Sequence, residues 1–171
     1  SRLYQKSAIG VPTEGGIIIN DEELMFCHWH RHLPLPENWL ENKLNSEPNF
    51  VHQIVAYDTI RSSGDKLVSK DGVWYLWNRE HHPSNSMHAS EVKWFSSKDT
   101  FDLDSIIDWT IGLEDSVNSD IAIVDEEMDV TMYRVSVVDP RGDLVPSTKD
   151  NHPNLGVEHL SRVFYRDDEI D

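Results

Sequence analysis

The hydrophobic and polar positions of this chain follow two different periods, which predicts a mixture of strands and helices. The clearest signal lies in the middle of the chain, where Lys66–Lys70 and Val73–Asn78 flank the dipeptide Asp71-Gly72. Two aromatic and β-branched runs around such a turn predict a β-hairpin. We expect further strands at Val51–Arg61 and Glu91–Ser96, because they are rich in the same residue types.

Capping residues mark the starts of two predicted helices. Asn20 is followed three positions later by Glu23, a spacing typical of a helix capping box. Asp104 precedes isoleucines at helical spacing, so we expect a helix that runs through Leu113. The segment Asp21–His32, which follows the first cap, fits either a helix or a strand, and both interpretations stay open.

The remaining elements complete an α+β fold. We expect strands at Gly16–Ile19, Asp120–Val124 and Val130–Val138, and helices at Pro36–Leu44 and Leu155–Tyr165. Together these elements predict a mostly antiparallel sheet of about six or seven strands with about three or four short covering helices.

The length of 171 residues suits one domain of ordinary size. No repeat or linker marks a boundary, so we expect residues 1–15 to form an irregular N-terminal arm and residues 16–171 to form a single α+β domain. The hydrophobic share of 38% supports a packed core. Apolar runs stay far below the roughly 20 residues of a membrane-spanning helix, so we expect no membrane span.

Cysteine usage favours a reducing compartment. Cys27 is the single cysteine, which excludes an internal disulfide, and no Asn-x-Ser/Thr glycosylation sequon occurs. The first residues, Ser1–Lys6, lack the layout of a secretory signal. Together these features predict a cytoplasmic protein.

The charge is strongly acidic and unevenly distributed. The net charge is −16, and the segment Asp99–Val130 has eleven acidic residues without any Lys or Arg. This balance disfavours direct binding to nucleic acid and favours a basic protein partner, although such segments also commonly form a solvated surface. Our first hypothesis is therefore a non-enzymatic interaction module. Its predicted partner-binding acids are Asp99, Asp102, Asp104, Asp125, Glu126, Glu127 and Asp129.

The segment Cys27–His32 carries a candidate metal site. On a strand, His28, His30 and His32 would share one face, whereas on a helix His28 and His32 would lie one turn apart. Imidazole nitrogens bind zinc and other transition metals, so these three histidines are the predicted ligands. The common zinc signatures are absent, and a surface element rich in histidine explains the pattern equally well.

A thiol nucleophile is the other chemistry that this segment suggests. Cys27 stands next to His28, and a nearby base can activate a thiol. A lone cysteine among hydrophobic residues is more commonly a small buried side chain. Our second hypothesis is a small metal-dependent or thiol hydrolase centred on Cys27, His28, His30 and His32, with no cofactor other than zinc or a similar metal.

A third hypothesis comes from the turn that follows Pro140. Arg141, Gly142 and Asp143 form a tripeptide that resembles the integrin-recognition motif of adhesive proteins and some viral capsids. Ordinary turn chemistry explains the same residues. With a first residue other than Met, the tripeptide suggests a structural or receptor-binding domain of a larger, viral-type polyprotein.

Overall fold

The structure, a computed structural model, describes residues 2–70, 72–138, 158–159 and 163–164. The chain divides into two units, Ser1–Val138 and Asp139–Asp171, and each is described by itself. In the second unit, β8 (Glu158–His159) pairs antiparallel with β9 (Val163–Phe164). These strands contradict the helix expected at Leu155–Tyr165. The predicted receptor motif, Arg141, Gly142 and Asp143, lies outside the described residues.

A five-stranded sheet forms the centre of the first unit. The strand order is β3-β4-β5-β6-β7. The hairpin predicted around Gly72 is confirmed, as are the strands predicted near Glu91, Ile121 and Val130. The strands are β3 (Lys66–Lys70), β4 (Val73–Trp77), β5 (Ser90–Ser96), β6 (Asn118–Val124) and β7 (Val130–Val135).

The sheet is mixed, which corrects one detail of the predicted α+β fold. Three of its pairings are antiparallel, but β5 and β6 run parallel, with Ser90 opposite Asn118 and Ser96 opposite Val124. The chain between them is long enough to form α5 (Leu103–Gly112) and to return to the same end of the sheet. Parallel pairing therefore brings the carboxyl ends of β5 and β6 together.

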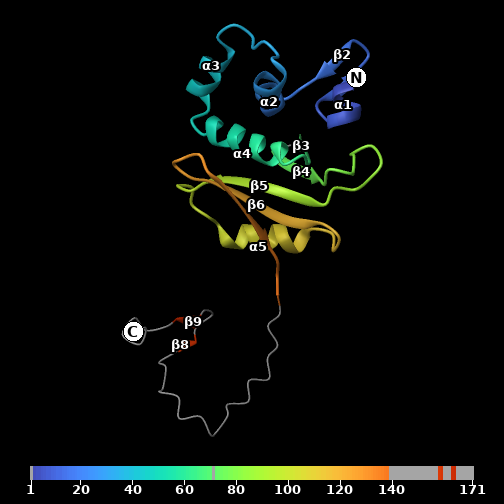
Figure 1. Cartoon of the computed structure of the whole chain (residues 1–171). Helices are drawn as coiled ribbons and strands as arrows, with labels where there is room; N and C mark the ends of the chain where they lie inside the picture. The colour runs from blue at the N-terminus through green and yellow to red at the C-terminus, as the bar shows by residue number, and fades with distance from the viewer. Residues whose placement is uncertain (1, 71, 139–157, 160–162, 165–171) are drawn as a thin grey trace. The chain divides into compact units, whose positions relative to one another are not determined.

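Helix α4 (Phe50–Ser62) covers one face of the sheet, and α5 lies on the other face (Figure 1). The strand expected at Val51–Arg61 was wrong. Phe50, Ile54, Tyr57 and Arg61 are buried at helical spacing, so the helix presents one continuous face to its neighbours. Burial of that face outweighs the β propensity of the individual residues.

The N-terminal segments pack on the outer side of α4. They are α1 (Arg2–Ser7), β1 (Val11–Thr13), β2 (Gly16–Ile18), α2 (Asp21–Arg31) and α3 (Trp39–Ser46). The first 15 residues are therefore not an irregular arm, and the expected boundary after Gly15 runs through the β1–β2 hairpin. In the described part of the chain, no helix has the length and hydropathy needed to cross a bilayer.

A capping box joins α2 to the segment before it, and it decides that Asp21–His32 begins as a helix. Asn20 Oδ1 accepts a hydrogen bond from the Glu23 amide at 2.8 Å, and Glu23 Oε2 accepts one from the Asn20 amide at 3.0 Å. The other carboxylate oxygen, Glu23 Oε1, accepts the Gly10 amide at 2.8 Å. Gly10 has φ +72°, and a Cβ there would lie 2.6 Å from Ile17. Glu23 therefore fastens the β1–β2 hairpin to α2.

The replacement Asn20→Ala should lower the free energy of unfolding by about 1 kcal/mol, because the Glu23 amide loses its acceptor. Urea denaturation measures this change. Asn49→Ala is the matched control, since Asn49 precedes α4 without a side-chain capping bond. Equal losses in the two variants would contradict the role of the Asn20 cap.

Candidate functional site

The face of the sheet that α5 covers carries a group of aromatic, acidic and basic side chains in contact with one another. Alternate residues of a strand share a face, so Glu91 and Lys93 of β5 lie on the same side. Trp109 of α5 identifies that side, because its Nε1 donates a hydrogen bond to Glu91 Oε2 at 2.9 Å. Tyr75 lies opposite Glu91 on the neighbouring strand β4.

His88 lies at the entrance to β5 and completes this group. Its imidazole packs edge-on against the rings of Tyr75 and Trp77, with centroid distances of 4.8 and 5.7 Å. Its Nε2 lies 3.9 Å from Glu91 Oε1, and the side chain is 19% exposed. The imidazole is therefore enclosed, beside a carboxylate, and still reachable from solvent. We call Tyr75, Trp77, His88, Glu91, Lys93 and Trp109 the α5-face site.

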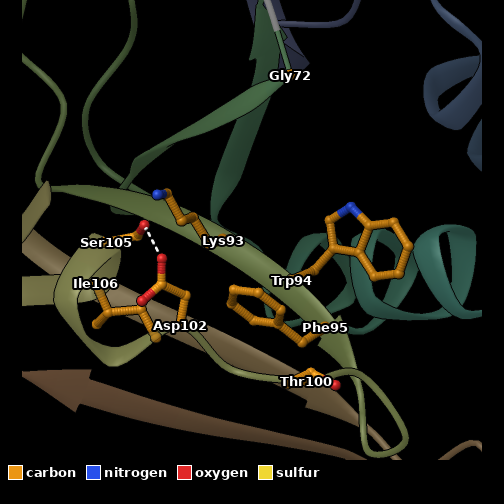
Figure 2. A pocket seen from close by; sticks show the side chains of 8 residues that line it. All are labelled: Gly72, Lys93, Trp94, Phe95, Thr100, Asp102, Ser105 and Ile106. Carbon is orange, nitrogen blue, oxygen red and sulfur yellow. Dashed lines mark hydrogen bonds between the residues drawn. The ribbon is translucent and has the colours of Figure 1, made fainter.

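Lys93 connects this site to a neighbouring cavity. Its Nζ lies 4.6 Å from the centre of the Trp109 ring, a cation–π contact. Beyond Lys93, a cavity of about 340 Å³ opens between β5 and the start of α5 (Figure 2). Phe95 and Ile106 give it apolar walls, and Asp102 accepts a hydrogen bond from Ser105 at one edge. The cavity can accept a flat, partly polar group.

A second cavity, of about 420 Å³, lies where β5 and β6 begin. The Arg134 guanidinium binds both oxygens of the buried Asp120 at 2.9 and 3.1 Å, and this pairing raises the pKa of Arg134. Ser90 also lines this cavity, and its buried hydroxyl has no hydrogen-bond partner among the described residues. The bidentate ion pair engages two of the charged groups of this cavity, and the third, Asp65, accepts hydrogen bonds from Ser63 and the Arg79 amide, so we regard the cavity as less suited to chemistry.

The predicted metal ligands lie on or at the end of α2, and His28 and His30 each bond to a group within the protein. His28 Nδ1 lies 2.8 Å from the Leu33 carbonyl, and His30 Nε2 lies 2.5 Å from Asp58 Oδ1. His32 ends the helix with φ 56°. Nowhere in the described residues do three or more His, Cys, Asp or Glu side chains form a group suited to a metal ion. The prediction of zinc at these histidines gains no support.

The acids before α5 are used in local structure. Asp99 Oδ2 accepts the Ser96 amide at 2.8 Å, which closes the turn after β5. Asp102 is the N-cap residue of α5, a position predicted for Asp104, and Asp104 lies in the first turn. The Ser105 hydroxyl holds the pKa of Asp102 below its usual range.

The acids of the β6–β7 turn are likewise partly engaged within the chain. Asp125 Oδ1 accepts the amides of Glu127 and Asp129, each at 2.9 Å. Glu126 forms an exposed ion pair with Lys98 at 2.9 Å. Both acidic turns therefore lie at the same end of the sheet, where the parallel strands β5 and β6 end.

The predicted site residues did not include the α5-face site. The sequence contained two signals for it. The period of the predicted hairpin places Tyr75 and Trp77 on one face, and His88 precedes a predicted strand. The pairing of β4 with β5, which brings these residues together, has no local signature in the sequence.

Comparison with known proteins adds one relative. No family model matches the sequence. The chain is similar to a tRNA-splicing endonuclease of Methanosarcina acetivorans, with 22% identity over 153 residues. The matched region covers 84% of this chain and 44% of the relative, so the chain spans less than half of the relative's length.

This similarity contradicts the predicted non-enzymatic interaction module, because the relative is named for an enzymatic activity. The acidic segment Asp99–Val130 and the absence of catalytic motifs led to that hypothesis, but a charged surface does not exclude an enzymatic site elsewhere in the chain. The hydrolase hypothesis is not supported either. Cys27 is 1% exposed, and burial raises the pKa of its thiol, so the reactive thiolate is disfavoured.

Labelling of Cys27 tests the last point. Because its pKa is raised, the thiolate fraction at pH 7.5 should fall below that of a free cysteine, and burial blocks access. We expect iodoacetamide to label the native protein at least about tenfold more slowly than the protein in urea. Mass spectrometry follows the reaction, and Cys27→Ser is the control without a thiol. Labelling at the same rate in both states would revive the thiol hypothesis.

Proposed function

We propose that this chain is a domain of an RNA endonuclease of the tRNA-splicing type. The similarity to the Methanosarcina acetivorans enzyme supports this proposal, since it extends over 84% of the chain. In this proposal, the α5-face site binds the phosphodiester that is cleaved. The observation that carries this assignment is the contact of the half-enclosed His88 imidazole with Glu91, 3.9 Å away.

The chemistry of RNA cleavage suits an imidazole. RNA carries its own nucleophile, the 2′-hydroxyl next to each phosphodiester. Attack of that oxygen on phosphorus breaks the bond to the 5′ oxygen, and one proton must leave the nucleophile while another reaches the leaving oxygen. Histidine is the side chain most suited to such transfers near neutral pH. Glu91, whose carboxylate accepts a hydrogen bond from Trp109, lies beside this imidazole, 3.9 Å from its Nε2.

The neighbouring cavity suits a nucleobase. Single-stranded RNA is commonly recognised through unstacked bases that pack on aromatic rings and bond through their edges. Phe95 offers a ring, and Asp102 and Ser105 offer polar atoms at the rim. Lys93, between the cavity and His88, supplies a positive charge for a phosphate.

One observation favours a second, narrower candidate function, in which the domain holds the RNA while a different part of the enzyme cleaves it. Phosphodiester cleavage needs two proton transfers, and the α5-face site has one imidazole. The Trp77 indole nitrogen donates to the Ser86 carbonyl at 2.9 Å, and the Lys93 ammonium rests on Trp109. Since the relative is more than twice as long as the matched region, its remaining part could supply the second group.

Replacement of His88 tests the proposal. The tagged chain is purified from the cells that naturally produce it, together with the chains that copurify. This preparation should cleave an intron-containing tRNA transcript. His88→Ala should lower the single-turnover rate by at least about 100-fold, because one proton-transfer group is lost.

His81→Ala is the matched control, since it removes an exposed imidazole from the same loop and should leave the rate unchanged. A His88→Ala protein that binds and cleaves at the wild-type rate would exclude catalysis at the α5-face site and favour the holding role. Absence of cleavage by the wild-type preparation would contradict the endonuclease proposal itself.

A further inference from the structure

A third cavity, of about 280 Å³, concentrates positive charge in this acidic protein. The chain has 15 Lys and Arg residues in total, and five of them line this one cavity, together with a single carboxylate from Asp65. Helices α1, α2 and α4, strand β3 and the segment after β4 contribute to it, so distant parts of the chain meet there. We call it the basic cleft, and its cations are Lys6, Arg31, Arg61, Lys66 and Arg79.

Arg61 is the buried base of the cleft. The residue is 6% exposed, and its guanidinium donates to the carbonyls of Leu67 at 3.2 Å and Ser7 at 2.6 Å. It also lies 5.2 Å from the ring centre of Phe26 and 5.9 Å from that of Tyr57. Hydrogen bonds and rings fix the position of this charge, but none of these partners is an anion.

Three of the other four cations of the cleft also bond to neutral groups. Lys66 Nζ donates to the carbonyls of Arg79 and His81 at 2.5 and 2.6 Å. Arg79 donates to the Ser63 carbonyl, and Arg31 donates to a serine hydroxyl at 2.8 Å. Within the described residues, no cation of the basic cleft forms an ion pair with a carboxylate within 4.0 Å.

Carbonyl groups satisfy the hydrogen-bonding geometry of these cations without cancelling their charge. Five positive charges and one negative charge line the cleft, which leaves an excess of four. Gly64 leaves room for the Arg79 guanidinium, because a Cβ there would lie 2.5 Å from Arg79 Nε. The buried Glu23 carboxylate interacts electrostatically with Arg61, but it does not line the cleft. An excess of cations around a cavity attracts oxyanions, and the planar guanidinium suits phosphate oxygens in particular.

We propose that the basic cleft binds the phosphodiester backbone of the RNA on which the protein acts. This inference rests on the proposed function, and it adds a second RNA contact apart from the α5-face site. The loop between β4 and β5 supports the choice of RNA over a small anion. Arg79 lies at the beginning of this loop in the cleft, and His88 lies at its end in the α5-face site. One strand of RNA that follows the loop would reach both.

Binding of an uncleavable RNA tests this assignment. The probe is a fluorescent single-stranded RNA with 2′-O-methyl groups throughout, which lacks the nucleophile and therefore reports binding alone. Lys6→Gln with Arg31→Gln removes two exposed cations of the cleft. Anisotropy titrations of the full chain measure how the association constant K depends on salt. The slope of log K against log salt should be smaller in magnitude for the double variant than for the wild type by about 1.4, or about 0.7 per lost phosphate contact. The affinity at about 0.1 M salt should then fall about 25-fold, if the two lines meet near 1 M.

The matched control is Lys70→Gln with Lys98→Gln, which removes the same charge from exposed positions outside the cleft. It should leave the slope and the affinity nearly unchanged. The single variant Lys6→Gln should give about half of the slope change. It replaces the double variant in the test if the double variant does not fold. Equal losses in the cleft variant and in the control, or no loss in either, would overturn the assignment.

Two further outcomes separate the possible failures. In the first outcome, inorganic phosphate at about 10 mM raises the melting temperature of the wild type but not of the cleft variant, and both proteins bind RNA equally. The cleft is then a small-anion site, and the RNA proposal is wrong. If RNA binds through the cleft but tRNA transcripts stay intact in the His88 experiment, the endonuclease proposal alone fails. If tRNA transcripts are cleaved but the cleft variant binds the RNA probe as well as the wild type does, only the proposal for the basic cleft is rejected.

Discussion

The packing of α4 on the sheet is the interaction on which the rest of the first unit depends. Tyr57 lies at its centre, where the ring packs edge-on against Trp74 at 5.6 Å and the buried hydroxyl donates to the Leu67 carbonyl at 3.0 Å. Desolvation of this hydroxyl raises its pKa far above the usual range, so it stays a neutral donor. The same helix supports α2 and α3 on its outer side. Loss of this packing would therefore separate the N-terminal layer from the sheet.

The two faces of the sheet consequently have different properties. The α4 face is filled by large apolar side chains such as Trp74 and Val92, and it is the core. Helix α5 packs less extensively on the other face, because Ile106 is its one buried residue, whereas α4 has six. Titratable groups such as Glu91 remain accessible there. A tightly packed face thus fixes the backbone, while the less covered face holds the groups that are suited to chemistry.

The net charge of this protein disfavours RNA binding, whereas the local charges of the basic cleft favour it. A value of −16 opposes RNA binding as long as the charge is treated as uniform. Several acids lie in the turns at one end of the sheet, where Asp99 and Asp125 accept backbone amides. Four cations gather instead around a fifth, Arg61, in the basic cleft. At physiological salt, charges farther apart than about 8 Å are largely screened, so an RNA strand responds mainly to the nearest group.

The sequence by itself determined the features that depend on neighbouring residues. The hairpin around Gly72 and the capping box of Asn20 and Glu23 were predictable because turn geometry and capping bonds form within a few positions. The tertiary structure decided that Val51–Arg61 is a helix, that β5 pairs parallel with β6, and that His88 meets Glu91 beside β4. Burial against the sheet selects the helix, and pairing between separate strands places His88 and Glu91, which are three residues apart in the chain, beside β4. No turn or capping motif specifies either outcome.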